Sequence, residues 1–196
     1  MDRRQAVELL GAVPFVGAFG LPPAAAQRGS RFLRELLATP AQTYAPKFFS
    51  QHEWQTVRML VDLVIPKDEH SGSATDAGTP EFMDFIMAEY PEEQLWMRGG
   101  LAWLDNEARR RFGTDFLASQ DAQRSAILDD IAWPDKAPAA LHQGVNFFNR
   151  FRDLTATGFW SSQMGVADIQ YKGNVFVMDW QGCPPEQLAK LGLGGH

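Results

Sequence analysis

The feature that most constrains this chain is a helical period in its apolar residues, repeated in one segment after another. The clearest stripe has intervals of four, three, four and four residues and consists of Met97, Leu101, Leu104, Ala108 and Phe112. Such intervals place side chains on one face of an α-helix, whereas a half-buried strand alternates with a period of two. We therefore predict an all-α fold, an irregular bundle of about five main helices.

Capping residues and prolines predict where these helices begin and end. Ser50 and Glu53 form the pattern of a capping box, and Pro66 ends the helix that follows, because the residue before a proline resists helical geometry. The remaining four helices are expected to start at Thr79 as N-cap with Pro80 after it, after Pro91, at Ser119 as N-cap, and near Ala139.

The last of these helices, about residues 139–157, is apolar on more than one side. A helix of this kind is either central in its own domain or covered by a partner. Beyond Gly158 the regularity declines, which predicts an extended, loop-rich C-terminal wrap. Within it we expect a turn at 171–174, a short strand at 175–180 and a final helical turn that ends at Gly192.

The N-terminus has the composition of an export signal. A short charged region with Arg3 and Arg4 precedes an apolar stretch of about 13 residues, and small residues including Ala24 and Ala26 follow. Residues 1–26 are therefore predicted to be a twin-arginine-type signal peptide cleaved after Ala26, with a periplasmic destination. The alternative is an uncleaved amphipathic arm. The apolar stretch is shorter than the ~20 residues that a membrane span requires.

After the leader we expect an extended lead-in over residues 27–49, with a short amphipathic turn near 32–37, and a helical domain over 50–196. The net charge of −6 disfavours non-specific binding to nucleic acid or anionic lipid. The run of Arg109, Arg110 and Arg111 is interpreted as a solvated helix face.

No motif for chemistry is present in the sequence. It lacks the haem-attachment, dinucleotide-binding, P-loop and nucleophile-elbow patterns, and its single cysteine, Cys183, cannot hold an iron–sulfur cluster. His52 in a first helical turn is expected to be solvated or capping. His70 follows Asp68 and Glu69 in a polar loop over 66–78, where a metal site is conceivable. We expect no catalytic, cofactor-binding or metal-binding residue in this chain.

Several short segments resemble the gluconate 2-dehydrogenase subunit 3 family in their order and spacing, over roughly residues 48–185. They are Leu60-Val-Asp-Leu-Val-Ile-Pro66, Gly78-Thr-Pro-Glu-Phe-Met-Asp84, Gly100-Leu-Ala-Trp-Leu-Asp105, Phe112-Gly113, Phe147-Phe148, Phe151-Arg-Asp-Leu-Thr155, Gly158-Phe159, Tyr171-Lys-Gly-Asn174 and Gly182-Cys183.

The resemblance implies a non-catalytic small subunit of a periplasmic flavin-dependent sugar or polyol dehydrogenase. The partner would be a flavoprotein of the glucose–methanol–choline type that holds the FAD. A c-type cytochrome subunit with haem c is a possible third component. The small subunit would support folding of the catalytic subunit and carry it through the twin-arginine system.

The aromatic surplus of the chain, six Trp and fourteen Phe, gives a partner-facing surface something to bury. Candidate residues for this surface are Phe147, Phe151, Trp160, Tyr171, Asn174 and Trp180. Cys183 is a candidate for a disulfide with the catalytic subunit, because an odd cysteine in an oxidising compartment is free or bonded to another chain. The alternative is a buried free thiol.

Two other functions are consistent with the sequence. One is an independent exported module that binds a sugar or an ion through the 66–78 loop and nearby aromatic residues. The other is a helical enzyme that uses His70 with Asp68 or Glu69.

Overall fold

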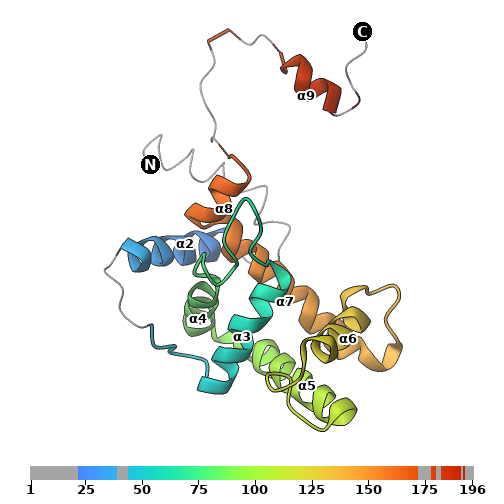
Figure 1. Cartoon of the computed structure of the whole chain (residues 1–196). Helices are drawn as coiled ribbons and strands as arrows, with labels where there is room; N and C mark the ends of the chain where they lie inside the picture. The colour runs from blue at the N-terminus through green and yellow to red at the C-terminus, as the bar shows by residue number, and fades with distance from the viewer. Residues whose placement is uncertain (1–21, 39–43, 172–177, 180–181, 191, 193–196) are drawn as a thin grey trace.

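The computed structural model describes residues 22–38, 44–171, 178–179, 182–190 and 192, and the regular elements in that part of the chain are all helices (Figure 1). The α-helices are α2 (Pro23–Ala38), α3 (Gln51–Val64), α4 (Thr79–Glu89), α5 (Gln94–Phe112), α6 (Asp121–Ala132), α7 (His142–Trp160), α8 (Gln163–Asp168) and α9 (Pro185–Lys190). Short 3₁₀ turns, η1 (Pro91–Glu93) and η2 (Ala139–Leu141), lead into α5 and α7. The all-α prediction is confirmed: the five predicted helices are α3 to α7, and α2 adds another.

Helix α7 is the centre of the bundle. It packs against α2, α3, α4, α5, α6 and α8, and Figure 1 shows it (orange) running through the middle of the molecule. Eleven of its 19 residues are buried. Of the two explanations for its wide apolar surface, the first therefore holds: the chain covers this helix itself.

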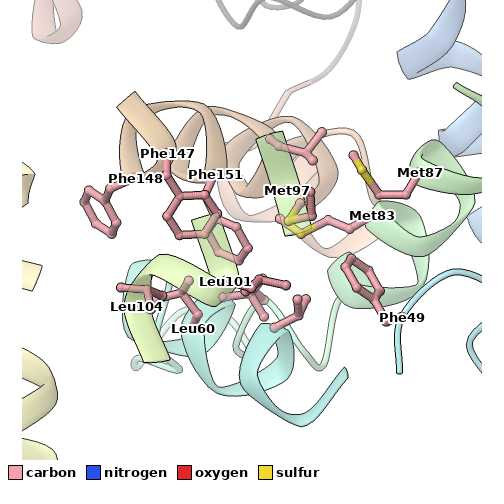
Figure 2. Packing of buried hydrophobic residues seen from close by; sticks show 14 of the residues in the cluster. Phe49, Leu60, Met83, Met87, Met97, Leu101, Leu104, Phe147, Phe148 and Phe151 are labelled. Atoms are coloured by element: carbon pink, nitrogen blue, oxygen red, sulfur yellow. The ribbon is translucent and has the colours of Figure 1, made fainter. Parts of the chain in front are cut away.

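The core around α7 is built from aromatic rings and aliphatic side chains. Figure 2 shows Phe147, Phe148 and Phe151 of α7 near Leu101 and Leu104 of α5. The two helices approach closely at Gly100, where a Cβ atom would lie only 1.7 Å from Cδ2 of Phe147. A side chain at this position would overlap the ring, so the contact between α5 and α7 depends on glycine.

The start of α3 agrees with the predicted capping box. The Glu53 amide donates to the Ser50 hydroxyl at 3.3 Å, and the Ser50 amide donates to Glu53 Oε2 at 2.8 Å. The helix ends at Val64, and Ile65 caps it before Pro66.

Two other predicted helix starts are wrong by one residue. Gly78, not Thr79, is the N-cap of α4, and its φ of 79° lies in the left-handed region. Leu33 of α2 explains the choice of glycine, because its Cδ1 lies 2.5 Å from where a Cβ of residue 78 would be. Helix α6 starts after Gln120, since the Ser119 hydroxyl donates to the carbonyl of Asp115 at 2.8 Å and is not used as a cap.

Helix α2 is longer than the short turn expected in the lead-in. It contacts α4 and α7, and the ring of Phe32 stacks on Phe85 with centroids 4.6 Å apart. Ala25, Ala26 and Leu33 are buried. The segment 27–38 is therefore part of the packed domain.

A single carboxylate holds the connection between α2 and α3. Asp84 of α4 is fully buried, and its oxygens accept hydrogen bonds from the amides of Lys47, Phe48 and Phe49 at 2.8, 2.9 and 3.2 Å. The Tyr44 hydroxyl donates to the same carboxylate at 2.7 Å. Burial and the neighbouring Asp84 raise the pKa of Tyr44 above its ordinary value. The chain entering α3 is thus bound to α4 before the helix begins.

The arginine run is only partly the solvated face that was predicted. The side chains of Arg109 and Arg110 are more than half exposed, whereas Arg111 is 19% exposed. Arg111 bonds both Glu107 and Asp130 at 2.6 Å and so ties α5 to α6. Hydrogen bonds from Arg110 and Arg111 lower the pKa of Glu107 to about 2.

Adjacent glycines in α5 allow a matched test of the α5–α7 contact. Gly100→Ala is expected to destabilise the fold by about 1–3 kcal/mol, because its methyl overlaps Phe147. Gly99→Ala, at a position with open space, is expected to be neutral or stabilising by up to about 1 kcal/mol. Urea denaturation followed by circular dichroism measures both. Equal midpoints for the two variants would contradict the packing described.

The low pKa of Glu107 predicts a dependence of stability on pH. A carboxyl whose pKa is lower in the folded state contributes stability above its ordinary value of 4.5, and that contribution is lost as the pH falls towards 2. Glu107→Gln should therefore lose less stability than the wild type over this interval. Glu92→Gln, at an exposed position, is the control and should keep the wild-type slope. Parallel curves for the Glu107 variant and the wild type would show that the ion pairs contribute nothing.

Candidate functional site

The C-terminal segment presents Cys183 on the surface. The thiol is exposed and free, so the alternative of a buried thiol does not hold. The preceding residue, Gly182, has a φ of 84°, and α9 begins at Pro185, two residues after Cys183. Figure 1 shows α9 (red) set apart from the bundle, and none of its residues is buried. A second chain can therefore reach this thiol without disturbing the core.

The predicted aromatic surface is divided by the structure. Phe147 and Phe151 lie in the core, 4% and 0% exposed, with ring centroids 5.5 Å apart. They are therefore not on the surface that the described chain presents. Trp160, at the end of α7, is half-buried, and Tyr171 is 46% exposed. Asn174 and Trp180 lie outside the described residues.

Trp160 has an unusual polar atom. Its ring packs edge-to-face on Phe159 with centroids 5.8 Å apart, and its Nε1 is buried with no hydrogen-bond partner in the described part of the chain. Trp160 lies with the exposed side chains of Ile169 and Tyr171 at the end of the bundle that precedes the C-terminal segment.

The residues assigned to export lie at the other end of the chain. Arg3 and Arg4 are outside the described residues. Ala24 is exposed and Ala26 is 2% exposed, and both belong to the first turns of α2. The bond after Ala26 therefore lies within a helix that packs on the domain.

The polar loop over 66–78 is ordered by its own side chains. The Asp68 carboxylate accepts hydrogen bonds from the amides of His70 and Ser71, both at 2.8 Å, and these bonds lower its pKa. Asp62 of α3 accepts from the amide of Thr75 at 2.8 Å. His70 is exposed at the tip of the loop. The carboxylates of Asp68 and Asp62 thus bind the loop backbone.

A cluster that the sequence did not reveal lies between α3, α5 and the loop after α5. His52 Nε2 is 2.7 Å from Asp105 Oδ2, and the amide of Phe116 donates to the other oxygen of Asp105 at 3.1 Å. The Asp105 side chain is 12% exposed and the His52 ring 43%. The predicted solvated or capping role of His52 is therefore incomplete, because its ring pairs with a carboxylate 53 residues away.

The cluster has the donor set of a possible cation site. The ligand atoms of His52, Asp105 and Asp115 lie within 4.8 Å of one another, the one such group among the residues with described positions. An imidazole and two carboxylates suit a divalent ion such as zinc. Against this, Arg109 lies 3.8 Å from Asp105, and the Asp115 carboxylate accepts from the amide of Ala118 at 2.8 Å. Both carboxylates therefore already have partners within the protein.

A pocket of about 260 Å³ opens beside this cluster. Its lining combines His52 and Asp105 with Glu53 and Arg98, which lie 3.5 Å apart, and with apolar Leu101. The pocket contains charged groups of both signs that pair with one another. The two hydroxyl groups of the lining bond the backbone: Ser50 accepts from the amide of Glu53 at 3.3 Å, and Thr56 donates to the carbonyl of His52 at 3.0 Å.

No helix in the described ranges is both long enough and apolar enough to cross a membrane.

Comparison with known proteins gives one family. The family model described as gluconate 2-dehydrogenase subunit 3 matches residues 51–179, more than half of the chain. The matched segment begins with α3 and continues past α8. No curated protein and no solved structure matches the chain.

Proposed function

Because the chain belongs to the gluconate 2-dehydrogenase subunit 3 family and is thus a subunit of a dehydrogenase complex, we propose that it is the non-catalytic small subunit of a flavin-dependent sugar or polyol dehydrogenase. The family match over α3 to α8 carries this proposal. The partner would be a flavoprotein of the glucose–methanol–choline type, and it would hold the FAD and the substrate. A c-type cytochrome would accept the electrons.

The hydrogen bonds made by three buried or partly buried carboxylates support a non-catalytic role. The carboxylates of Asp62, Asp84 and Asp105 bind backbone amides of connecting segments. A general base needs a lone pair directed at a substrate proton, and these carboxylates direct theirs at the protein itself. Oxidation of a sugar also requires an electron acceptor, which this proposal assigns to the partner.

The leader supports a role in export. Arg3 and Arg4 head an apolar stretch of the twin-arginine type. That pathway carries proteins already folded, so a flavoprotein bound to this chain would cross with it and reach the periplasm. The small subunit would act in addition as a folding support, since an assembled partner has less apolar surface exposed to water.

The position of Cys183 supports a covalent link to the partner. The thiol is exposed on a segment apart from the core. After export, it and a cysteine of the flavoprotein would each lose a proton, and the pair would pass two electrons to a thiol oxidant of the periplasm as the S–S bond forms.

Co-purification tests the assembly. The full chain with a C-terminal tag, recovered from a periplasmic extract, is expected to bring down a large protein with a flavin absorbance spectrum and sugar- or polyol-dehydrogenase activity. The same chain expressed without a flavoprotein partner should give no activity. Turnover by the purified chain alone, or a soluble monomer that binds a sugar or ion and no flavoprotein, would contradict the proposal.

Gel electrophoresis tests the covalent link in that complex. Without reductant, the small subunit should migrate with the flavoprotein, and with reductant it should migrate alone. Cys183→Ser removes the only thiol of the chain and should abolish the slow band, while the native complex still co-purifies. Unchanged mobility of the wild type in the two gels would discard the disulfide and leave the assembly itself intact.

A further inference from the structure

We infer that docking of α2 protects the Ala26–Gln27 bond, the predicted cleavage site of the leader, from signal peptidase. The folded chain therefore keeps residues 22–26 after export. This inference rests on the proposed export and concerns what happens to the leader. Hydrolysis would break the Ala26 carbonyl–Gln27 nitrogen bond, with water supplying the hydroxyl of the new carboxyl group and a proton of the new amine.

The bond lies inside a helix. Helix α2 starts at Pro23, and the amides of Ala25 and Ala26 donate to the carbonyl of Pro22 at 2.9 and 3.3 Å. The carbonyl of Ala26 accepts a hydrogen bond from the Ser30 hydroxyl at 2.8 Å. A signal peptidase must take its substrate as an extended strand, which requires these bonds to break.

Packing holds the helix in place on both sides of the bond. Ala25 and Ala26 are 0% and 2% exposed. One turn later, Gly29 meets Phe82 of α4 so closely that a Cβ would lie 2.3 Å from its ring. Leu33 fills the space over Gly78. To extend residues 24–28, the first half of α2 must leave α4.

Polar contacts add to the docking. The Arg28 guanidinium donates to the Tyr90 hydroxyl, and its carbon lies 5.3 Å from the centroid of that ring. Cleavage would also place a new ammonium group at the start of the remaining helix, where the helix dipole disfavours positive charge. The docked state therefore opposes both the reaction and its product.

Whether the bond is cut depends on whether the chain folds before it meets the peptidase. Cleavage of a folded protein proceeds through the fraction of molecules that are locally open. The twin-arginine route delivers the chain folded, with α2 docked on α4 and α7. A peptidase therefore meets a protected bond, and any processing falls before Pro22.

Intact-mass spectrometry of the wild-type complex from the periplasm tests the inference. Residues 22–26 are expected to be present, with or without the residues before them. A folded periplasmic chain whose first residue is Gln27 would overturn it. A chain found only in the cytoplasm would contradict the proposed export instead, and the cleavage experiment below would then decide the inference.

Purified full-length protein is incubated with a purified signal peptidase in detergent, and cleavage after Ala26 is followed with time. Gly29→Leu, which collides with Phe82, should be cut faster by about tenfold or more. Arg31→Leu, the same new side chain on the exposed face of α2, should be cut no faster than the wild type.

A second variant guards against general unfolding. Leu33→Ala removes a buried contact of α2 without a collision, and it should also increase cleavage while the circular dichroism spectrum of the bundle is retained. Equal cleavage of the wild type, Gly29→Leu, Leu33→Ala and Arg31→Leu would show that docking does not protect the bond.

Discussion

The path of the chain into α3 depends on the buried carboxylate of Asp84. Its two oxygens accept three backbone amides and the Tyr44 hydroxyl, and so bind the segment over 44–49 to the middle of α4. A buried carboxylate is tolerated only when its oxygens are satisfied, and buried amides outside a helix need acceptors just as much. The amides thus satisfy the carboxylate oxygens, and the carboxylate in turn supplies the acceptors that the amides need. Because Ser50 follows this segment directly, the capping box of α3 is placed against α4 by the same contact.

Carboxylates on helices also bind backbone amides in two other connecting loops. Asp62 of α3 binds the loop before α4 through Thr75, and Asp105 of α5 binds the loop before α6 through Phe116. In each case a helix supplies the acceptor that an irregular backbone segment lacks. Asp62, Asp84 and Asp105 therefore all bind the backbone of connecting segments. In the proposed function, export would act through the leader that precedes α2, and assembly through the exposed segment that carries Cys183.

Prediction from the sequence succeeded where the controlling interactions are local. The capping box at Ser50, the end of α3 before Pro66 and the period of α5 depend on residues within one or two turns of one another. The central position of α7 was one of two alternatives, and the decision needed its neighbours. The leader over 1–26 and the strand over 175–180 concern residues that the structure describes only in part.

The amino-acid sequence by itself determined the helices, their approximate ends and the absence of catalytic motifs, because periodicity and caps are properties of short segments. Tertiary structure decided which apolar faces meet. It placed Phe147 and Phe151 in the core rather than on a partner surface, and it paired His52 with Asp105 across 53 residues. It also made Gly78 the cap of α4, because Leu33 of another helix occupies the space of a side chain. An apolar stripe shows that a face must be covered, but only the packed chain determines what covers it.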